Sequence, residues 1–564
     1  MKKTIFPYIL KNAYEFNGSV NEKAVLGLVL RSHPELKKDV PAVLKEINDL
    51  TKEVSKLTPE EIKKQLQDIS PELLQEEKEE IKGPFKSLPN AVEGEFVVRI
   101  APSPSGALHI GHAYGAALNA GYAEMYDGKF ILRIEDTNPE NIYPDAYKLI
   151  QEDAQWLTNN KVSQVVIQSD RLGIYYDYAE KLVDQNDAYV CICDADQGRE
   201  LKNKSQACPC RNLPKKEQLE RYAKMFGEYA EGEAVLKVKT DINHKNPAMR
   251  DFPIMRINEH VHPKTGKKQR VWPLMVFSVA IDDHELGITH VLNGKDHADN
   301  AKKEAMIMEM LHWKPPEYKH WGRINFEGFQ LSTSKTRLKI EHGEYTGWDD
   351  IRLPFLPALR RRGYQPEAFR KFAASIGLSL NDKTVSQEEF WKMINSFNGE
   401  CIEANSNRYF AIIEPLGIKV NKAPSGIVEV PLHPNHPEKG KRKLPVKEEI
   451  YITEEDYKQL ILGKVHRLID YCNFTINKGK LTFHSKDYDS YRSSKDKGKI
   501  IHWLPIEETV DIEIKHPDGK TMVGKGEKIL KKLPKGTIIQ LERMFFARID
   551  SIDKEKIVLW YLHE

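Results

Sequence analysis

One stretch of the chain, residues 96–134, constrains the fold more than any other part of the sequence. Apolar residues at 96–100 and 130–134 predict two short strands, and small residues at 108–123 predict a helix between them. A strand, a helix and a second strand at this spacing form a parallel pair joined by a right-handed crossover. Residues 96–134 therefore predict the centre of an α/β domain.

The turn between the first strand and the helix has the composition of an anion site. Ligands of parallel sheets bind beyond the carboxyl ends of the strands, where residues 99–106 and 135–138 must lie. The helix start offers free backbone N–H groups and a positive dipole end, and His109 and His112 share one face of its first turn. Gly111 between them leaves room for a nucleotide. Two surface histidines at an ordinary helix start are the alternative interpretation.

The composition predicts a soluble protein with several domains. The chain has 564 residues, 40% hydrophobic and 30% charged, which is enough for about three to five globular domains. No apolar run reaches the roughly 18 residues of a membrane helix, and residues 5–10, interrupted by Pro7, are too short for a signal peptide. We therefore expect a cytoplasmic protein without membrane contact. The net charge is +2, but residues 431–564 carry 26 basic and 21 acidic groups, a weak sign of a polyanionic partner.

The two ends of the chain differ from its centre. Residues 1–90 predict a helical domain, with helix starts at Pro59 and Pro71, and its simplest interpretation is a docking or stabilising appendage without chemistry. Helical patterns return at 348–403. Beyond residue 428, short alternating stretches separated by turns predict β-barrels or a sandwich. The expected further elements are a strand at 165–167, a helix at 175–186, and strands at 449–452, 481–484, 500–503, 510–514, 538–546 and 557–562.

Residues 99–112 read Arg-Ile-Ala-Pro-Ser-Pro-Ser-Gly-Ala-Leu-His-Ile-Gly-His and resemble the HIGH signature of class I aminoacyl-tRNA synthetases. The loop has the form of glutamyl-tRNA synthetases, whereas glutaminyl enzymes usually carry Pro-Pro-Glu-Pro-Asn. Further stretches that resemble this branch are residues 132–139, 277–297, 347–350, 360–364 and 500–503. The resemblance covers most of residues 95–564, and the helical N-terminus with an all-β C-terminus is similar to the archaeal type.

This resemblance implies a multidomain α/β plus all-β fold. The expected parts are an N-terminal helical extension (1–90), a Rossmann-type catalytic domain (91–345), a helical stem-contact domain (346–428) and anticodon-binding β-barrels (429–564). An acceptor-binding insertion is expected within the catalytic domain, at about 190–290.

The second signature of the family, KMSKS, is altered in this chain. Residues 330–337 read Gln-Leu-Ser-Thr-Ser-Lys-Thr-Arg, so Thr333 stands where the lysine usually is and Lys335 follows two positions later. We expect Lys335 to contact the β- and γ-phosphates of ATP, supported by the hydroxyls of Ser332 and Ser334. A Ser/Thr-rich surface turn is the alternative. The resemblance adds further ATP contacts, at Ser103, His109, His112, Asp296 and His297.

A glutamate pocket can be argued from the residues at the strand ends. Arg99 offers a rigid fork for a carboxylate, and Glu135 suits the substrate ammonium group. Ser103 adds a hydroxyl and Ala101 backbone contacts. A direct salt bridge between Arg99 and Glu135 is the structural alternative.

Two positions depart from the family pattern around this pocket. Tyr and Arg of bacterial glutamyl enzymes are replaced by Met275 and Asn293, and Arg256 could compensate for the missing cation.

Four cysteines form a separate constellation. Cys191 and Cys193 are followed after fourteen residues by Cys208 and Cys210, a pattern that suits tetrahedral thiolate coordination of a structural zinc. Reduced thiols are the alternative, because two-residue spacing within each pair is more common. The remaining Cys401 and Cys472 are expected to be packed thiols.

The resemblance implies ATP-dependent attachment of L-glutamate to the 3′ end of tRNA(Glu) through a glutamyl-adenylate, with Mg²⁺ accompanying ATP. His109, Gly111, His112 and Lys335 would form the catalytic set, acting by position and charge. A glutaminyl-tRNA synthetase is the alternative enzyme, and a tRNA-binding paralogue without catalysis is the alternative from another class. Charging of tRNA(Gln), the oligomeric state and protein partners stay open.

Overall fold

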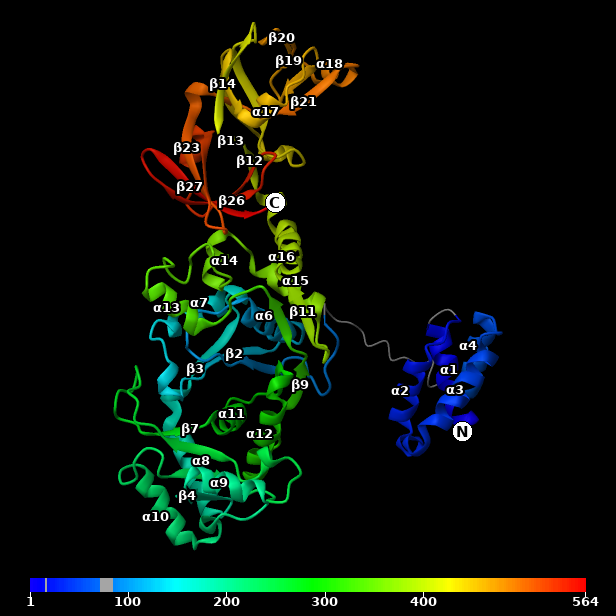
Figure 1. Cartoon of the computed structure of the whole chain (residues 1–564), viewed down its shortest axis with the longest axis vertical. Coiled ribbons are helices and arrows are strands. Elements are labelled where there is room, and N and C mark those ends of the chain that lie inside the picture. Colours follow the sequence, from blue (N-terminus) through cyan, green and yellow to red (C-terminus); the bar gives the residue numbers. More distant parts are fainter. Residues whose placement is uncertain (16–17, 71–84) are drawn as a thin grey trace. The chain divides into compact units, whose positions relative to one another are not determined.

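The computed structural model (Figure 1) describes residues 1–15, 18–70 and 85–564. The chain divides into two compact units, residues 1–88 and residues 89–564, and each is described by itself. Across these described residues, no helix has both the length and the apolar character that a membrane span requires.

The first unit is a small helical bundle. Its described residues form α1 (Lys2–Glu15), α2 (Glu22–Ser32), the 3₁₀ helix η1 (Pro34–Asp39), α3 (Val40–Val54) and α4 (Pro59–Ile69). Buried apolar side chains close the core, among them Ile9, Val25, Val43, Ile47, Ile62 and Leu66. The predicted helix start at Pro59 is confirmed, and Thr58 caps it by accepting the N–H of Glu61 at 3.3 Å. The start predicted at Pro71 lies outside the described residues.

The second unit is built around parallel strands. β1 (Val97–Ile100), β2 (Lys129–Ile134) and β3 (Val162–Ile167) pair in that order, and α6 (Ile110–Met125) connects the first two. This confirms the predicted strand, helix and strand, although β3 begins before the expected residue 165.

The parallel arrangement continues on the other side of β1. The N–H of Thr289 donates to the carbonyl of Val97 at 3.0 Å, which places β8 (His290–Gly294) beside β1. β8 pairs in parallel with β9 (Glu317–Trp321). The chain order therefore reverses between β1 and β8, and such a switch point opens a crevice for ligands beyond the strand ends.

Helices and an inserted antiparallel sheet lie between β2 and β9 in the chain. The inserted sheet has the order β4 (Ala188–Cys191), β5 (Val235–Val238), β6 (Pro253–Ile257) and β7 (Val271–Pro273). The helices are α7 (Ala146–Leu157), α8 (Leu172–Asp184), α9 (Ala195–Asn203), α10 (Lys215–Met225), α11 (Met275–Glu285) and α12 (Ala298–Met310). Buried side chains of α8, β4 to β7, α11 and α12 share one core around Trp272.

The short helix α14 (Leu356–Arg362) is bonded at both of its ends. At its start, the N–H of Leu356 donates to the carbonyl of Leu108, in the turn before α6, at 2.8 Å. At its end, Arg361 donates to Asp550 at 2.9 Å and Arg362 to the carbonyl of Leu562 at 2.7 Å. Neighbouring elements are β10 (Ile324–Glu327), α13 (Thr333–Glu341), α15 (Pro366–Ile376), β11 (Lys383–Ser386) and α16 (Gln387–Ile402).

The C-terminal region is almost entirely β-structure, as predicted. One sheet has the order β12-β25-β26-β27-β23-β24-β13, a second has the order β21-β18-β19-β20-β14-β17-β22, and β15 pairs with β16. Each seven-stranded sheet encloses its own apolar core. The bounds are β12 (Asn407–Tyr409), β13 (Ala411–Ile413), β14 (Pro415–Asn421), β15 (Gly426–Pro431), β16 (Lys441–Val446), β17 (Glu449–Thr453), α17 (Glu454–Lys458), β18 (Val465–Leu468), β19 (Asn473–Asn477), β20 (Lys480–Ser485), α18 (Tyr488–Ser493), β21 (Lys497–Ile501), β22 (Leu504–Pro505), β23 (Thr509–Lys515), β24 (Thr521–Glu527), β25 (Ile538–Leu541), β26 (Phe546–Ile552) and β27 (Lys556–His563).

Candidate active site

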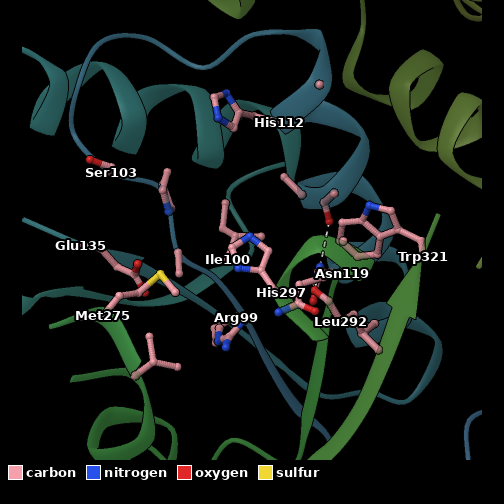
Figure 2. Close-up of a pocket in the computed structure, with 18 of the residues that line it drawn as sticks. Arg99, Ile100, Ser103, His112, Asn119, Glu135, Met275, Leu292, His297 and Trp321 are labelled. Carbon is pink, nitrogen blue, oxygen red and sulfur yellow. Dashed lines mark hydrogen bonds between the residues drawn. The ribbon is translucent and has the colours of Figure 1, made fainter. Parts of the chain in front are cut away.

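A cavity of about 310 Å³ lies at the carboxyl ends of β1 and β8, at the switch point of the strand order. Figure 2 shows Arg99, Glu135 and Met275 together on one side of it and His112 on the other. The structure brings many of the residues singled out in the sequence to this one cavity. They are Arg99, Ala101, Ser103, Gly111, His112, Glu135, Met275, Asn293 and His297.

Arg99 and Glu135 line the same cavity, but they do not pair with each other. The Nε and Nη2 atoms of Arg99 donate to the two carboxylate oxygens of Asp283 at 3.1 and 3.0 Å. Glu135 accepts instead from Arg133, at 3.1 Å. The salt bridge considered as the structural alternative is therefore replaced by two separate pairs, and both residues keep a side that faces the cavity.

Arg99, Arg133, Asp283 and Glu135 form what we call the charge network. Arg133 is completely buried and joins its two pairs, because it donates to both Asp283 and Glu135. The two guanidinium groups hold the pKa of Asp283 below its usual value despite burial. Sequence reasoning assigned no role to Arg133 or Asp283. Their signal was a charged residue inside an otherwise apolar strand or helix, which requires a buried partner.

The histidine pair lies at the start of α6, as expected, and each ring has a fixed acceptor nitrogen. The Nδ1 of His109 accepts the N–H of Gly111 at 3.1 Å, and the Nδ1 of His112 accepts the N–H of His109 at 3.2 Å. Each neutral ring therefore carries its proton on Nε2, which is left as a donor. Loss of hydration lowers the pKa of His109 to about 2 and that of His112 to about 4. Both rings are neutral at pH 7, and only His112 lines the cavity.

Two glycines of the first signature are required by close packing. A Cβ at Gly111 would lie 2.9 Å from the ring of His109, and one at Gly106 would lie 2.5 Å from the ring of Trp348. Neither site admits a larger residue without a shift of its neighbour. The turn at Gly106 is thus packed closely against Trp348, in the segment between α13 and α14.

The second signature loop, residues 330–337, lies outside the cavity lining. Lys335 is exposed in the first turn of α13, and Ser332 caps this helix by accepting the N–H of Lys335 at 3.4 Å. Thr333, at the position of the usual lysine, places its hydroxyl 3.0 Å from that of Ser105 in the first signature. The two signatures are therefore neighbours. The exposed hydroxyl of Ser334 and the exposed side chain of Asp296 also lie outside the cavity lining.

The positions that depart from the family pattern have distinct surroundings. Asn293 lines the cavity, and its Oδ1 lies 2.6 Å from the Nδ1 of His320. Met275 lines it with an apolar side chain. Arg256 is not brought to the cavity: it donates to Asn138 at 2.9 Å. Glu304, which the sequence did not single out, lines the cavity as well.

The four predicted cysteines converge at the end of β4. Their sulfur atoms all lie within 4.8 Å of one another, and Cys193 Sγ is 3.3 Å from Cys208 Sγ. The Nζ of Lys237 lies 3.3 Å from Cys191 Sγ, and Arg221 donates to Cys210 Sγ at 3.3 Å. Four thiolates with two adjacent cations fit a tetrahedral metal site.

The other two cysteines stand apart from this cluster. Cys472 is buried in the core of the second seven-stranded sheet, and Cys401 donates to the carbonyl of Phe397 at 3.2 Å.

A second group of potential metal ligands, Glu403, His433 and His436, has a different character. The Nδ1 of buried His433 accepts the N–H of Asn435 at 3.2 Å, so its proton must sit on Nε2. That Nε2 lies 3.2 Å from a carboxylate oxygen of Glu403. The nitrogen that would bind a metal is therefore already a hydrogen-bond donor, and these residues form a hydrogen-bonded cluster.

Comparison with known proteins agrees with this geometry. The model of "tRNA synthetases class I (E and Q), catalytic domain" matches residues 95–404, and that of the corresponding "anti-codon binding domain" matches residues 406–489. A glutamate–tRNA ligase of Methanothermobacter thermautotrophicus is 43% identical over 561 residues, covering 99% of both chains. Those of Pyrococcus furiosus and Methanocaldococcus jannaschii are 43% and 41% identical over the whole of both chains.

The fold and these matches define a class I aminoacyl-tRNA synthetase, which is a ligase. Within that class, the chain belongs to the E and Q family, and the resemblance stated from its motifs is confirmed.

Proposed function

We propose that this synthetase attaches glutamate to tRNA in the cavity between β1 and β8, by way of a glutamyl-adenylate. Glutamylation of tRNA is supported by the names of relatives that match the whole chain. The observation that supports this location is the convergence of Arg99, Glu135 and His112 on one cavity. Glutamate requires a cation for its carboxylate and an anion for its ammonium group, and ATP requires a hydrogen-bond donor for its phosphates.

Arg99 and Glu135 bind the amino acid in this proposal. Asp283 occupies two nitrogens of Arg99 and thereby fixes the orientation of the guanidinium group, while Nη1 remains for the substrate. Glu135 receives the substrate ammonium. Ser103 adds its hydroxyl and Ala101 its backbone at the cavity wall. Such a site is preorganised, because the supporting ion pairs exist before the substrate binds.

Phosphate chemistry takes place at the start of α6. An α-carboxylate oxygen of glutamate forms a bond to the α-phosphorus of ATP, and the bond to pyrophosphate breaks. His112 donates from Nε2 to the phosphates, while the N–H groups of Ile110 and Gly111 donate to Pro354 and His109 and hold the turn in shape. His297, Asp296, Ser332 and Ser334 are further ATP contacts. When bound together with ATP, Mg²⁺ would supply positive charge that offsets the charge of the pyrophosphate leaving group.

Lys335 must move to take part in this step. It is exposed outside the cavity lining, so the second signature loop closes over the β- and γ-phosphates when ATP is bound. In the second step, the 2′-oxygen of the terminal adenosine forms the ester, AMP leaves, and the hydroxyl proton passes to solvent. Only position and charge are asked of the protein.

The tRNA is bound by the parts assigned from the sequence: an acceptor-binding insertion at about 190–290, a stem-contact region at 346–428 and anticodon-binding barrels at 429–564. An aromatic ring suited to stacking on an anticodon base is present in the last part. Tyr488 is 51% exposed, and the guanidinium of Arg467 lies 5.3 Å from its ring centre. We take tRNA(Glu) as the substrate, with tRNA(Gln) as a second one to be tested, and place the reaction in the cytoplasm.

The cysteine cluster is proposed to hold a structural zinc ion. Cys191, Cys193, Cys208 and Cys210 would supply a closed tetrahedral set, and Lys237 and Arg221 would offset its negative charge. Metal analysis of the purified chain is expected to find about one zinc per chain, lost in a Cys208→Ala variant. Zinc content equal in both proteins would contradict this assignment.

Aminoacylation with separate tRNA(Glu) and tRNA(Gln), each with glutamate and with glutamine, tests the function. We expect a rate with glutamate and tRNA(Glu), and a KM for glutamate that rises in Arg99→Ala while the KM for ATP changes little. Charging with glutamine alone would favour the glutaminyl alternative. No rate under any condition would favour a tRNA-binding paralogue.

A further inference from the structure

Glu304 is a buried acid whose carboxyl group belongs to the wall of the cavity. It projects from α12, is 4% exposed and lines the cavity with Arg99 and Glu135. The groups that face it come from four other elements. They are Arg99 on β1, Arg133 and Glu135 at the end of β2, Asp283 on α11 and Tyr318 on β9. Buried carboxyl groups without a committed cation are rare in proteins and require a physical reason.

The cations near Glu304 are already committed to other acids. Arg99 is held by Asp283 through two bonds, and Arg133 is shared by Asp283 and Glu135. Two guanidinium groups thus face three carboxyl groups, if Glu304 is included. Bound glutamate would add one ammonium group and two carboxylates, so five acidic groups would stand against three cations. A proton on one of these acids reduces the excess of negative charge in the pocket.

We propose that Glu304 is a specificity residue for glutamate: its carboxyl group meets the side-chain carboxylate of the substrate and shares a proton with it. The inference rests on the proposed placement of glutamate in this cavity. One oxygen of the substrate carboxylate accepts from Arg99, and the other accepts the proton carried by Glu304. Two carboxyl groups that share one proton are a known solution to close like charges in a site of low polarity.

The surroundings supply the protonated form that this contact needs. Burial, together with the charge of Asp283, raises the pKa of Glu304 to about 8, so the group is mostly neutral at pH 7. Glutamine would instead offer an amide N–H, which ionised Glu304 accepts more strongly than neutral Glu304, whose carbonyl oxygen is the weaker acceptor. About one tenth of the molecules are ionised one pH unit below the pKa, so at pH 7 most of them offer glutamine only the weaker acceptor.

The selectivity should therefore fall as the pH rises through about 8. Below that pH Glu304 is neutral and glutamate is favoured, and above it the ionised group repels glutamate and accepts from glutamine. Between pH 7 and pH 9 the neutral fraction of Glu304 falls about tenfold, so the ratio of kcat/KM for glutamate to that for glutamine is expected to fall about tenfold or more. Steady-state aminoacylation of the full chain with saturating ATP and tRNA measures this ratio. A constant ratio over this range would overturn the proposal without any variant.

The variant Glu304→Gln separates this role from a structural one. Its amide N–H is a permanent donor, so kcat/KM for glutamate should lose the decline above pH 8, and the preference over glutamine at pH 7 should weaken because an amide N–H is a weaker donor than a carboxyl O–H. The matched control is Glu309→Gln, on the same helix and exposed, which should keep the pH profile of the parent. A parental pH profile in Glu304→Gln would overturn the proposal.

Arg99→Ala distinguishes failure of this inference from failure of the proposed site. If Arg99→Ala leaves the KM for glutamate unchanged, glutamate does not bind in this cavity and both proposals fall. If Arg99→Ala raises that KM while Glu304→Gln keeps the parental profile, only the role of Glu304 is wrong. The KM for ATP serves as a measure of intact folding, because the ATP contacts do not include Glu304.

Discussion

The charge network and the second signature loop are two charged regions of one proposed active site, and they are built in opposite ways. Arg133 and Asp283 are buried, with every strong interaction made to another protein group. Lys335 is exposed at the first turn of a short helix. Buried pairs cannot rearrange without leaving a charge uncompensated, whereas an exposed lysine moves at little cost. We therefore expect the amino-acid side to be preformed and the phosphate side to be completed only when ATP binds.

The largest effect is expected from breaking the charge network. Asp283→Asn leaves Arg99 and Arg133 without their shared anion in a buried site, which should cost about 3–5 kcal/mol of stability. Differential scanning calorimetry of the full chain measures the loss. Asp299→Asn, which removes an exposed partner of Lys302, should change stability by less than about 0.5 kcal/mol. A similar loss of stability in both variants would contradict the prediction that the buried ion pair contributes more to stability than the exposed one.

If Lys335 contacts the phosphates only after the loop moves, its removal should lower kcat without lowering the stability of the protein. Lys335→Ala should lower kcat about 100- to 1000-fold, because a contact to the departing pyrophosphate is lost, while the thermal midpoint and the KM for glutamate stay close to those of the parent. Lys339→Ala, on the same helix, is the control and should retain the parental kcat. A raised KM for glutamate in Lys335→Ala would mean that the loop also shapes the amino-acid side.

The displaced lysine can be tested by moving it back. In a Thr333→Lys, Lys335→Ala double variant, the lysine occupies the usual family position, and we expect about a tenfold recovery of kcat over Lys335→Ala alone. The hydrogen bond between Thr333 and Ser105 is lost in this variant, which limits the recovery. Stopped-flow or steady-state measurements of kcat suffice. No recovery would indicate that this loop is adapted to Lys335 alone.

The smallest effect concerns the histidine pair. Because the pKa values of His109 and His112 lie below 6.5, their folded forms resist protonation, and the stability that depends on neutral rings declines as the pH falls from 6.5 toward 4. Between pH 6 and 8 neither ring changes charge. The ratio of kcat/KM for ATP in the parent to that in His112→Asn should therefore be constant over this range. A change of more than about threefold near pH 6.5 would contradict neutral rings.

The sequence predicted the position of the site better than its internal bonding. The strand and helix pattern placed Arg99 and Glu135 at one sheet edge. The apolar periodicity locates the strand ends, and the crossover through a helix makes the two strands parallel, so both ends lie at the same edge. The partner of Arg99 could not be predicted in this way. Asp283 is 184 residues away in the chain, and only the packing of α11 against the strands brings it near. The same holds for Glu304, whose helix carries no motif that points inward.

The outcome at Arg256 shows another limit of the sequence. A missing cation at Asn293 suggested a replacement nearby, but the strand that carries Arg256 directs it to Asn138. The residue type alone could not predict to which side of its strand Arg256 points. Side chains alternate along a strand, and the register of this strand depends on its pairing within the inserted sheet. Motifs thus located the residues, and tertiary packing decided which of them meet.

The helix α14 connects the turn before α6 to the C-terminal sheet. Its first residue, Leu356, donates a hydrogen bond to the turn that carries the histidines. Its last two arginines donate hydrogen bonds to Asp550 and to the carbonyl of Leu562 in the C-terminal sheet. A helix this short has little length over which it could bend between these contacts. The turn before α6 and the last C-terminal sheet are therefore connected through one short helix, and we expect a substitution at either contact to shift the position of the other.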